Sequence, residues 1–246
     1  MRIDCLSIFP EIIKSALASS IPGKAQERGI LLLGHHDIRE YSVDKHHKTD
    51  DIPYGGGVGM VFKPEPVAAA IEALRQPQSL VIHPSPAAPR LTQADVIKLS
   101  EQEHLIFLAS RYEGMDQRIL DTHVDLEFSL GDYVISGGEL AVAMIIDAIV
   151  RLLPGAISKE ESFREDSFFN GLLDYPHYTR PADFQGNAVP EVLLSGHHEN
   201  IRRWRKERAL ERTLRFRPDL LDGHELDKEG RAMLRKLREE AGRSED

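Results

Sequence analysis

The sequence predicts an α/β domain with a mainly parallel sheet, followed by a small helical domain. Over the first 150 residues, short apolar runs of strand type alternate with segments of helical period, and this alternation is typical of a parallel sheet covered by helices. A polar, charged stretch begins near residue 158, and the pattern from residue 191 onward is helical. A length of 246 residues also agrees with one or two domains.

The first elements follow from apolar runs and proline. Residues 2–8 form an apolar run of strand type, and Pro10 opens a helix expected at 11–18, because proline suits the first helical turn. A second strand is expected at 29–39, and an alanine-rich helix at 64–75.

The next elements have clear boundaries. A strand at 80–83 is closed by prolines, and Thr92 is a suitable N-cap for a helix at 93–103. Residues 105–110 predict another buried strand, and a short helix is expected at 117–122.

Residues 129–140, SLGDYVISGGEL, are the centre of the prediction. Aromatic and β-branched residues at 133–135 favour a short strand. Gly137 and Gly138 allow a sharp turn into an apolar helix expected at 140–153, which must be buried on several faces. In the second domain, helices are expected at 200–216 and 227–241.

Composition restricts the class of protein. The chain is 41% hydrophobic and 29% charged, with a net charge of -9, as in soluble globular proteins. No apolar run approaches the roughly 20 residues of a membrane span, and the first residues lack the cleavage site of a signal peptide. Cys5 is the only cysteine, which excludes an intramolecular disulfide. We therefore expect a cytoplasmic protein that does not enter a membrane.

Three loops that follow predicted strands are rich in Gly, Pro or Ser: 84–88, 111–114 and 136–138. Because parallel strands end at one edge of a sheet, where ligands gather, these loops are expected to line one pocket. The alternative is that they are ordinary turns. For residues 111–114, two interpretations stay open: a simple ion pair between Arg111 and Glu113, or Tyr112 and Glu113 facing a ligand.

A glycine-rich loop, PYGGGVGM, occupies residues 53–60. It lacks the Lys-Ser or Lys-Thr of a phosphate-binding P-loop and the spacing of a dinucleotide-binding loop. Its amides can still bind a phosphate, and the long polar segment before it is typical of substrate-gripping loops. A flexible turn is the alternative.

A basic run at 201–217 has eight Arg or Lys against two Glu, although the chain as a whole is acidic. Arginine forks suit phosphates, and Trp204 can stack on bases, so this helix is expected to bind RNA. The alternative is a solvated basic helix. An acidic cluster at 160–166, taken alone, reads as solvated surface.

Several long motifs together resemble a known family, the bacterial tRNA (guanine-N1)-methyltransferases that modify the guanosine at position 37, beside the anticodon. The motifs are SIFPE, TDDIPYGGGVGM, RYEGMDQRIL, SLGDYVISGGEL, RLLPG, EDSF, GLLDYPHYTRP and LLSGHHENIRRWR, and they occur in order along nearly the whole chain.

The resemblance implies a fold and three regions. The fold is a SPOUT-type parallel sheet with a deep trefoil knot, plus a small C-terminal helical domain. Residues 1–157 would form the knotted domain, 158–175 a mobile linker, and 176–246 a helical tRNA-binding domain. S-adenosylmethionine would bind in the knot to Pro84, Ser85, Pro86, Ser110, Tyr112, Glu113, Gly114, Tyr133, Val134, Ile135, Gly137, Gly138 and Leu140.

The resemblance also implies a reaction. Asp166 would remove the proton from guanine N1, and Arg151 would stabilise the charge that builds on O6. The enzyme would be a homodimer whose active sites draw on both chains, with a requirement for Mg²⁺ bound near Glu113 and Asp166. The tRNA anticodon stem-loop would contact Asp50, Tyr54, Gly55, Gly56, Gly57, Gly59, Ser162, Asp174, His177, Arg202, Arg203 and Arg205.

The chain departs from the family pattern in two places, both in the expected cofactor pocket. Residues 85–88 read SPAA where the family commonly has SPQG, and Ser110 stands where a glycine commonly precedes RYEG. Two functions from other classes are the alternatives: a non-catalytic RNA-binding protein that uses the basic helix alone, and a nucleotide-hydrolysing enzyme built on PYGGGVGM.

Overall fold

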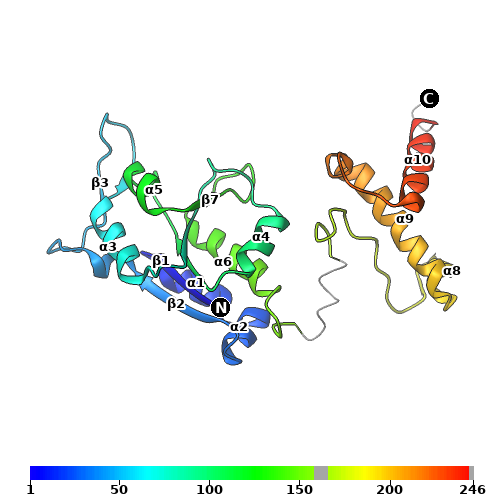
Figure 1. Ribbon diagram of the computed structural model, residues 1–246, viewed down its shortest axis with the longest axis horizontal. Coiled ribbons are helices and arrows are strands. Elements are labelled where there is room, and N and C mark those ends of the chain that lie inside the picture. The colour runs from blue at the N-terminus through cyan, green and yellow to red at the C-terminus, as the bar shows by residue number, and fades with distance from the viewer. Residues whose placement is uncertain (158–165, 244–246) are drawn as a thin grey trace. The chain divides into compact units, whose positions relative to one another are not determined.

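The structure, a computed structural model, describes residues 1–157 and 166–243. Contacts divide the chain into two compact units, Met1–Glu160 and Glu161–Asp246. Each unit is described by itself, and their elements are labelled in Figure 1.

The first unit is built on a five-stranded sheet in which every neighbouring pair is parallel. In spatial order the strands are β2 (Leu32–Asp37), β1 (Arg2–Ser7), β6 (His104–Leu108), β5 (Ser79–Pro84) and β7 (Leu126–Phe128). The predicted α/β class with a parallel sheet is therefore confirmed. The expected trefoil knot stays a prediction.

Helices cover both faces of this sheet. Strand side chains alternate between two cores: Leu105 and Phe107 of β6 pack into one core, and Ile106 and Leu108 into the other. The first core is closed by α1 (Pro10–Leu17), α2 (Ser20–Glu27), α4 (Gln93–Ser100) and α6 (Gly138–Val150). The second is closed by η1 (Ile38–Tyr41), α3 (Pro64–Leu74) and α5 (Gln117–His123).

Local start signals identified several helices correctly. Pro10 is the first residue of α1, and Thr92 caps α4 by accepting a hydrogen bond from the Asp95 N–H, which completes a capping box. Helix α6 starts at Gly138, two residues before the expected position. Its apolar residues are buried on most faces, as predicted.

The strand expected at residues 133–135 is wrong. These residues form an exposed loop, in which the Tyr133 N–H donates to the Gly131 carbonyl and Val134 is 82% exposed. The last strand of the sheet is β7, only three residues long and therefore too short to show an alternating pattern. Helix α2 was also missed.

A small antiparallel pair carries the glycine-rich loop of the first unit. Strand β3 (Asp50–Asp51) pairs with β4 (Val61–Phe62), and Asp50 lies opposite Phe62. The residues between the two strands extend from the body of the unit (Figure 1).

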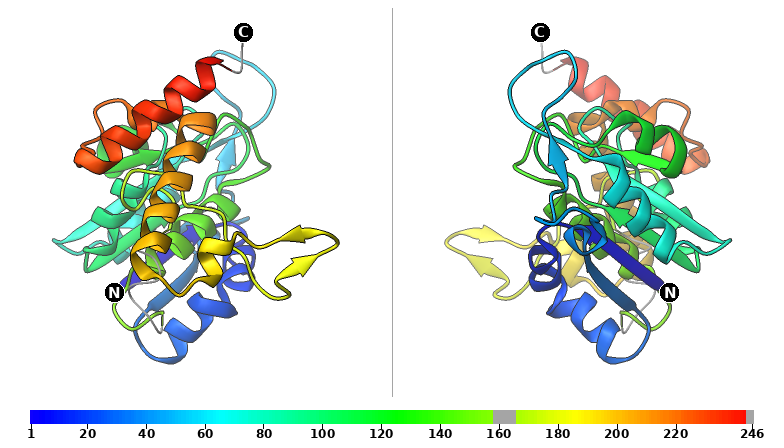
Figure 2. Two further views of the ribbon diagram at one scale, coloured as in Figure 1. Left: turned by 90° about the vertical axis from the view of Figure 1, so that its right-hand side faces the viewer. Right: turned by 90° about the vertical axis from the view of Figure 1, so that its left-hand side faces the viewer.

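The second unit is mainly helical. It contains α8 (Glu191–Leu194), α9 (His198–Phe216), η2 (Pro218–Leu221) and α10 (Lys228–Arg243). Leu210, Leu221, Met233, Leu234 and Leu237 form its core. A hairpin of β8 (Asp183–Phe184) and β9 (Asn187–Ala188) projects from these helices (Figure 2, yellow).

The expected linker is described only from residue 166 onward; residues 158–165 lie outside the described residues. Residues 166–175 are attached to the second unit, because Leu172 packs on its core and the Leu173 N–H donates to Thr213 Oγ1 at 3.0 Å. Mobility of this segment stays a prediction. No helix in the described ranges is both long enough and apolar enough to cross a membrane.

Candidate functional site

A cavity of about 380 Å³ lies at the carboxyl edge of the parallel sheet, where β5, β6 and β7 end. The three loops singled out in the sequence line it together, and the volume is within the range of small-molecule sites. All thirteen residues expected to bind the cofactor are among its lining: Pro84, Ser85, Pro86, Ser110, Tyr112, Glu113, Gly114, Tyr133, Val134, Ile135, Gly137, Gly138 and Leu140.

Gly138 allows α6 to begin directly against the end of β6. Its N–H donates to the Ser110 carbonyl at 2.7 Å. A Cβ at this position would lie 3.0 Å from Ser110 N and 3.2 Å from Ala109 Cα, so only glycine fits without moving backbone. The close approach of helix and strand forms one wall of the cavity.

A buried carboxylate ties two walls of the cavity together. Glu139, in the first turn of α6, is 1% exposed and accepts hydrogen bonds from Ser7 Oγ (2.8 Å) and Arg111 Nε (2.9 Å). The Arg111 guanidinium also lies over the Phe9 ring, at 4.5 Å from its centre. Arg111 therefore pairs with Glu139, and the Arg111–Glu113 ion pair considered from the sequence is not the arrangement found.

A hydrogen-bonded relay that sequence reasoning missed forms part of the cavity lining. His83, at 3% exposure, contacts Glu127 Oε1 through Nδ1 (2.9 Å) and Ser110 Oγ through Nε2 (3.0 Å). Burial lowers the pKa of His83, and the hydrogen bond to Glu127 opposes this shift only in part. The one available signal was a histidine at the end of a buried strand, directly before the Pro84 loop.

The glycine-rich loop reaches the rim of the same cavity. Glu113 N–H donates to the Met60 carbonyl at 3.0 Å, and a Cβ on Gly59 would lie 2.4 Å from Glu113 Oε1. Tyr112 has a positive φ of 60°, which is unusual for a tyrosine, and its ring packs on Phe62 with 5.4 Å between ring centres. The structure thus brings the expected substrate loop beside the expected cofactor residues.

The tip of this loop faces solvent. Tyr54 is fully exposed, and Gly55, Gly56 and Gly57 all have positive φ with open space around their Cα atoms. Backbone at these φ values favours glycine, and a backbone without side chains can approach a ligand closely. Asp50, half-buried in β3, lies at the base of the loop.

Arg151 is the C-cap residue of α6, at the end opposite the cavity. Its N–H donates to the Asp147 carbonyl, and its side chain is half-buried. At 1.5 Å per residue, the 13-residue helix separates Arg151 from Gly138 by roughly 20 Å. The expected cation and the cavity of one chain are therefore at opposite ends of one helix.

The second unit has a pocket of about 510 Å³ lined by Ser167, Leu173, Asp174, Tyr175, His177, Arg212 and Phe216. Asp174 Oδ2 contacts His177 Nε2 at 2.7 Å, and the Arg205 guanidinium lies 4.9 Å from the centre of the Tyr175 ring. Asp166, the expected base, directly precedes Ser167 and is half-buried. Asp174 and His177 thus follow Asp166 closely in sequence, and Arg205 of α9 contacts Tyr175, which lies between them in the chain.

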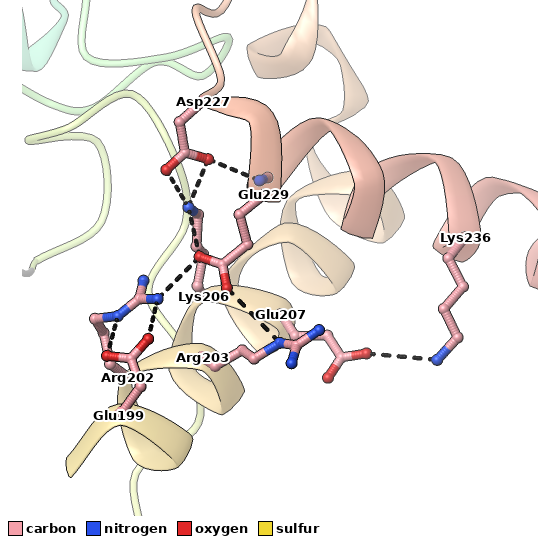
Figure 3. A network of polar contacts seen from close by, with 9 residues as sticks. Glu199, Arg202, Arg203, Lys206, Glu207, Asp227, Glu229 and Lys236 are labelled. Carbon is pink, nitrogen blue, oxygen red and sulfur yellow. Dashed lines mark hydrogen bonds and ion pairs between the residues drawn. The ribbon is translucent and has the colours of Figure 1, made fainter.

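Arg202 and Arg203 lie on another side of α9, facing α10 (Figure 3). Glu229 of α10 is the centre of this network: its carboxylate is 3.0 Å from Arg202 Nη2, 3.7 Å from Arg203 Nε and 3.3 Å from Lys206 Nζ. Hydrogen bonds from Arg202 and Lys206 lower the pKa of Glu229 although burial opposes them. Much of the basic charge of α9 is therefore balanced inside the unit.

The expected metal ligands lie in different units, Glu113 in the first and Asp166 in the second. Within residues 1–157 and 166–243, no three His, Cys, Asp or Glu side chains gather as a metal site. Ser162, expected to contact substrate, lies outside the described residues.

Together these features define an α/β protein with a glycine-walled ligand cavity at the edge of a parallel sheet, joined to a helical unit rich in arginine. A family model described as tRNA (Guanine-1)-methyltransferase TrmD matches residues 1–223, and the chain belongs to this family.

The sequences of curated relatives match this chain over nearly their full length. A protein of Halalkalibacterium halodurans is 50% identical over 243 residues, which cover 98% of this chain and 99% of the relative. Proteins of Ruminiclostridium cellulolyticum and Carboxydothermus hydrogenoformans are each 49% identical, over 225 and 234 residues, covering 90% and 95% of this chain and 97% and 92% of the relatives. All three are named tRNA (guanine-N(1)-)-methyltransferase.

Proposed function

We propose that the protein transfers a methyl group from S-adenosylmethionine to N1 of guanosine 37 in tRNA, next to the anticodon. Family membership and the names of the relatives support the reaction on guanine N1. The observation that most supports the donor is that thirteen residues assigned to it by resemblance, spread over 57 positions of the chain from Pro84 to Leu140, surround one cavity.

The cavity suits a nucleoside with a flexible charged tail. Val134, Ile135 and Leu140 offer apolar surface, and Gly114, with open space at its Cβ position, leaves bare backbone that can approach a ring closely. When bound there, S-adenosylmethionine supplies a methyl group on a positively charged sulfur. The protein then has to position guanine N1 and manage its proton.

Guanine N1 carries a proton, and its lone pair is delocalised into the ring amide. Removing this proton builds negative charge on O6, so the site needs a base near N1 and a cation near O6. We assign the base to Asp166 and the cation to Arg151. Asp166 belongs to the unit that carries the Asp174–His177 pair and the basic helix, which supports a base that arrives together with bound RNA.

The position of Arg151 supports a homodimer with shared active sites. The roughly 20 Å along α6 argue against its use in its own chain's cavity. The outer face of α6 is apolar and exposed, with Leu140 at 53% and Met144 at 56% exposure, and such a surface is typical of an interface. A second copy packed on this face would bring the partner's Arg151 toward the cavity.

The anticodon stem-loop is proposed to contact both units. In the first unit, the exposed loop with Tyr54 and Gly55–Gly57 would grip substrate beside the cavity rim. In the second, Arg202, Arg203 and Arg205 would contact phosphates, and Asp174, His177 and Ser162 are further expected substrate contacts. Arginine suits this role because its planar fork matches phosphate oxygens.

The proposal has three further parts: the knot, the Mg²⁺ requirement and the location. The trefoil knot is consistent with the five-stranded parallel sheet of this chain and with its family membership. The described residues do not assemble a Mg²⁺ site, so no step is assigned to the ion, and the expected Mg²⁺ requirement is measured by rates with and without EDTA. A cytoplasmic location agrees with the single cysteine.

The proposed function is tested with an unmodified tRNA transcript that has guanosine at position 37, and with tritium-labelled S-adenosylmethionine. Label should enter the RNA, and mass spectrometry of nucleosides and fragments should locate it as N1-methylguanosine at that position. A transcript with adenosine at position 37 is the matched control and should stay unlabelled. Label at another atom or position, or none, would contradict the proposal.

A further inference from the structure

The relay of Ser110, His83 and Glu127 decides how the Ser110 hydroxyl can be used by a ligand. Ser110 lines the cavity and is half-buried, while His83 behind it is 3% exposed and Glu127 is partly exposed at the far end. The two contacts, 3.0 Å and 2.9 Å, use both nitrogens of the His83 ring. The ring therefore couples the carboxylate to the hydroxyl.

The Glu127 carboxylate determines where the protons of His83 and Ser110 lie. Ionised Glu127 can only accept, so His83 Nδ1 must carry the hydrogen of the 2.9 Å contact. Burial lowers the pKa of His83 and favours the neutral ring, whose Nε2 is then an acceptor. The Ser110 hydroxyl must donate its proton to Nε2, which leaves only the lone pairs of Ser110 Oγ for the cavity.

We propose that Ser110 is a specificity-determining residue of the cofactor cavity: oriented by His83 and Glu127, it presents a hydrogen-bond acceptor to a donor group of the bound nucleoside. S-adenosylmethionine carries such donors in its adenine amine, its ribose hydroxyls and its ammonium group. A group that only accepts would face a lone pair at this position and be disfavoured. The inference rests on the proposed methyl donor and adds a residue that selects it.

The chain contains a second relay that serves as a matched control. Ser79 Oγ contacts His104 Nδ1 at 2.7 Å, and His104 Nε2 contacts Asp4 Oδ2 at 2.8 Å. Ser79 and His104 begin β5 and β6, so this relay lies at the amino edge of the same sheet and away from the cavity. It joins the same kinds of group, and His104 is as buried as His83 (2% and 3% exposed), although Ser79 and Asp4 are more buried than Ser110 and Glu127. It has no role in the proposed binding of the nucleoside.

The first test measures S-adenosylmethionine affinity by calorimetry on the full-length protein. Ser110→Ala should bind about fivefold more weakly, the effect expected for one hydrogen bond, while Ser79→Ala should bind as wild type does. Equal binding by Ser110→Ala, or equal weakening by both variants, would overturn the inference. Ser110→Gly, which also removes the hydroxyl, replaces Ser110→Ala if the latter fails to fold.

The same experiment separates this inference from the proposed function. If the wild-type protein does not bind S-adenosylmethionine, the proposed donor is wrong and the inference falls with it. If the wild-type protein binds and Ser110→Ala binds equally well, the donor stands and only the role of Ser110 is overturned.

The second test reads the proton positions directly. Nitrogen-15 NMR of wild-type protein should show His83 with Nδ1 protonated and Nε2 bare; a protonated Nε2 would overturn the inference. Glu127→Gln supplies an amide that can donate to Nδ1 and so permits the other tautomer, in which the Ser110 proton turns to the cavity. This variant should show the second tautomer and about twofold to fivefold weaker binding; wild-type affinity together with the second tautomer would overturn the role of the relay.

Discussion

The two units hold their charged groups in opposite ways. At the cavity of the first unit, the Glu139 carboxylate is 1% exposed and bonded to Ser7 and Arg111. On α9 of the second unit, cations and carboxylates meet at the surface, as in the pairing of Arg202, 49% exposed, with Glu229. Removing one partner of a buried pair lowers stability strongly, because the other charge is left with neither a partner nor solvent. An exposed pair contributes little to stability.

This difference indicates what each unit is suited to bind. Buried pairs hold the cavity walls in one arrangement, which suits recognition of a small nucleoside. A cation in an exposed pair can change its anionic partner, so the arginines of α9 can bind a phosphate in place of a carboxylate at a small cost in free energy. Changes in the first unit should therefore affect the donor and stability, and changes in the second should affect RNA and turnover.

The largest expected effect separates turnover from donor binding. Asp166→Ala should lower single-turnover methylation by about 10²–10⁴-fold, the usual contribution of a general base. Donor affinity should stay close to wild type, because the cavity is built by the first unit. Asp222→Ala, an exposed aspartate of the same unit, is the control and should leave the rate unchanged. Equal rates for wild type and Asp166→Ala would show that another group is the base.

The contrast between buried and exposed pairs is tested by two glutamates. Glu139→Gln should lower the free energy of unfolding by about 3 kcal/mol, because it leaves Arg111 facing a neutral amide in a largely buried site. Glu240→Gln, which removes an exposed partner of Lys236, should cost less than about 0.5 kcal/mol. Urea unfolding of both variants provides the measurement, and similar losses would contradict the comparison.

The proposed RNA-binding surface is tested by substitutions in the basic helix α9. Replacing Arg202, Arg203 and Arg205 by Gln should weaken tRNA binding at least about tenfold at low salt and reduce the slope of log affinity against log salt. Lys98→Gln in the first unit, an exposed cation outside the proposed surface, is the control and should leave both unchanged. An unchanged slope in the triple variant would remove these three arginines of α9 from the RNA interface.

The smallest expected effect is a gain. Glu229→Gln removes the carboxylate that Arg202, Arg203 and Lys206 share (Figure 3). Arg202 stays paired with Glu199 and Lys206 with Asp227, so the gain should be small, about twofold tighter tRNA binding at low salt. Glu240→Gln makes the same charge change without a contact to α9. If both variants gain equally, net charge rather than release of these cations is the cause.

The sequence by itself determined the elements whose signals are local. Pro10 and Thr92 identified helix starts because a cap depends on neighbours within a few residues. Alternating strands and helices predicted the parallel sheet, and the rule that parallel strands end at one edge predicted that three separate loops share a cavity. Local propensity failed at residues 133–135, which pair with no strand of the described sheets and form an exposed loop.

Only the tertiary structure decided which polar groups meet. Arg111 pairs with Glu139, 28 positions away, and not with Glu113; Ser7 reaches the same carboxylate across 132 positions. The contacts of His83 and the division of the α9 arginines between Tyr175 and Glu229 likewise join distant segments. Such pairs depend on the order and register of strands and on how helices pack, which no pattern of neighbouring residues contains.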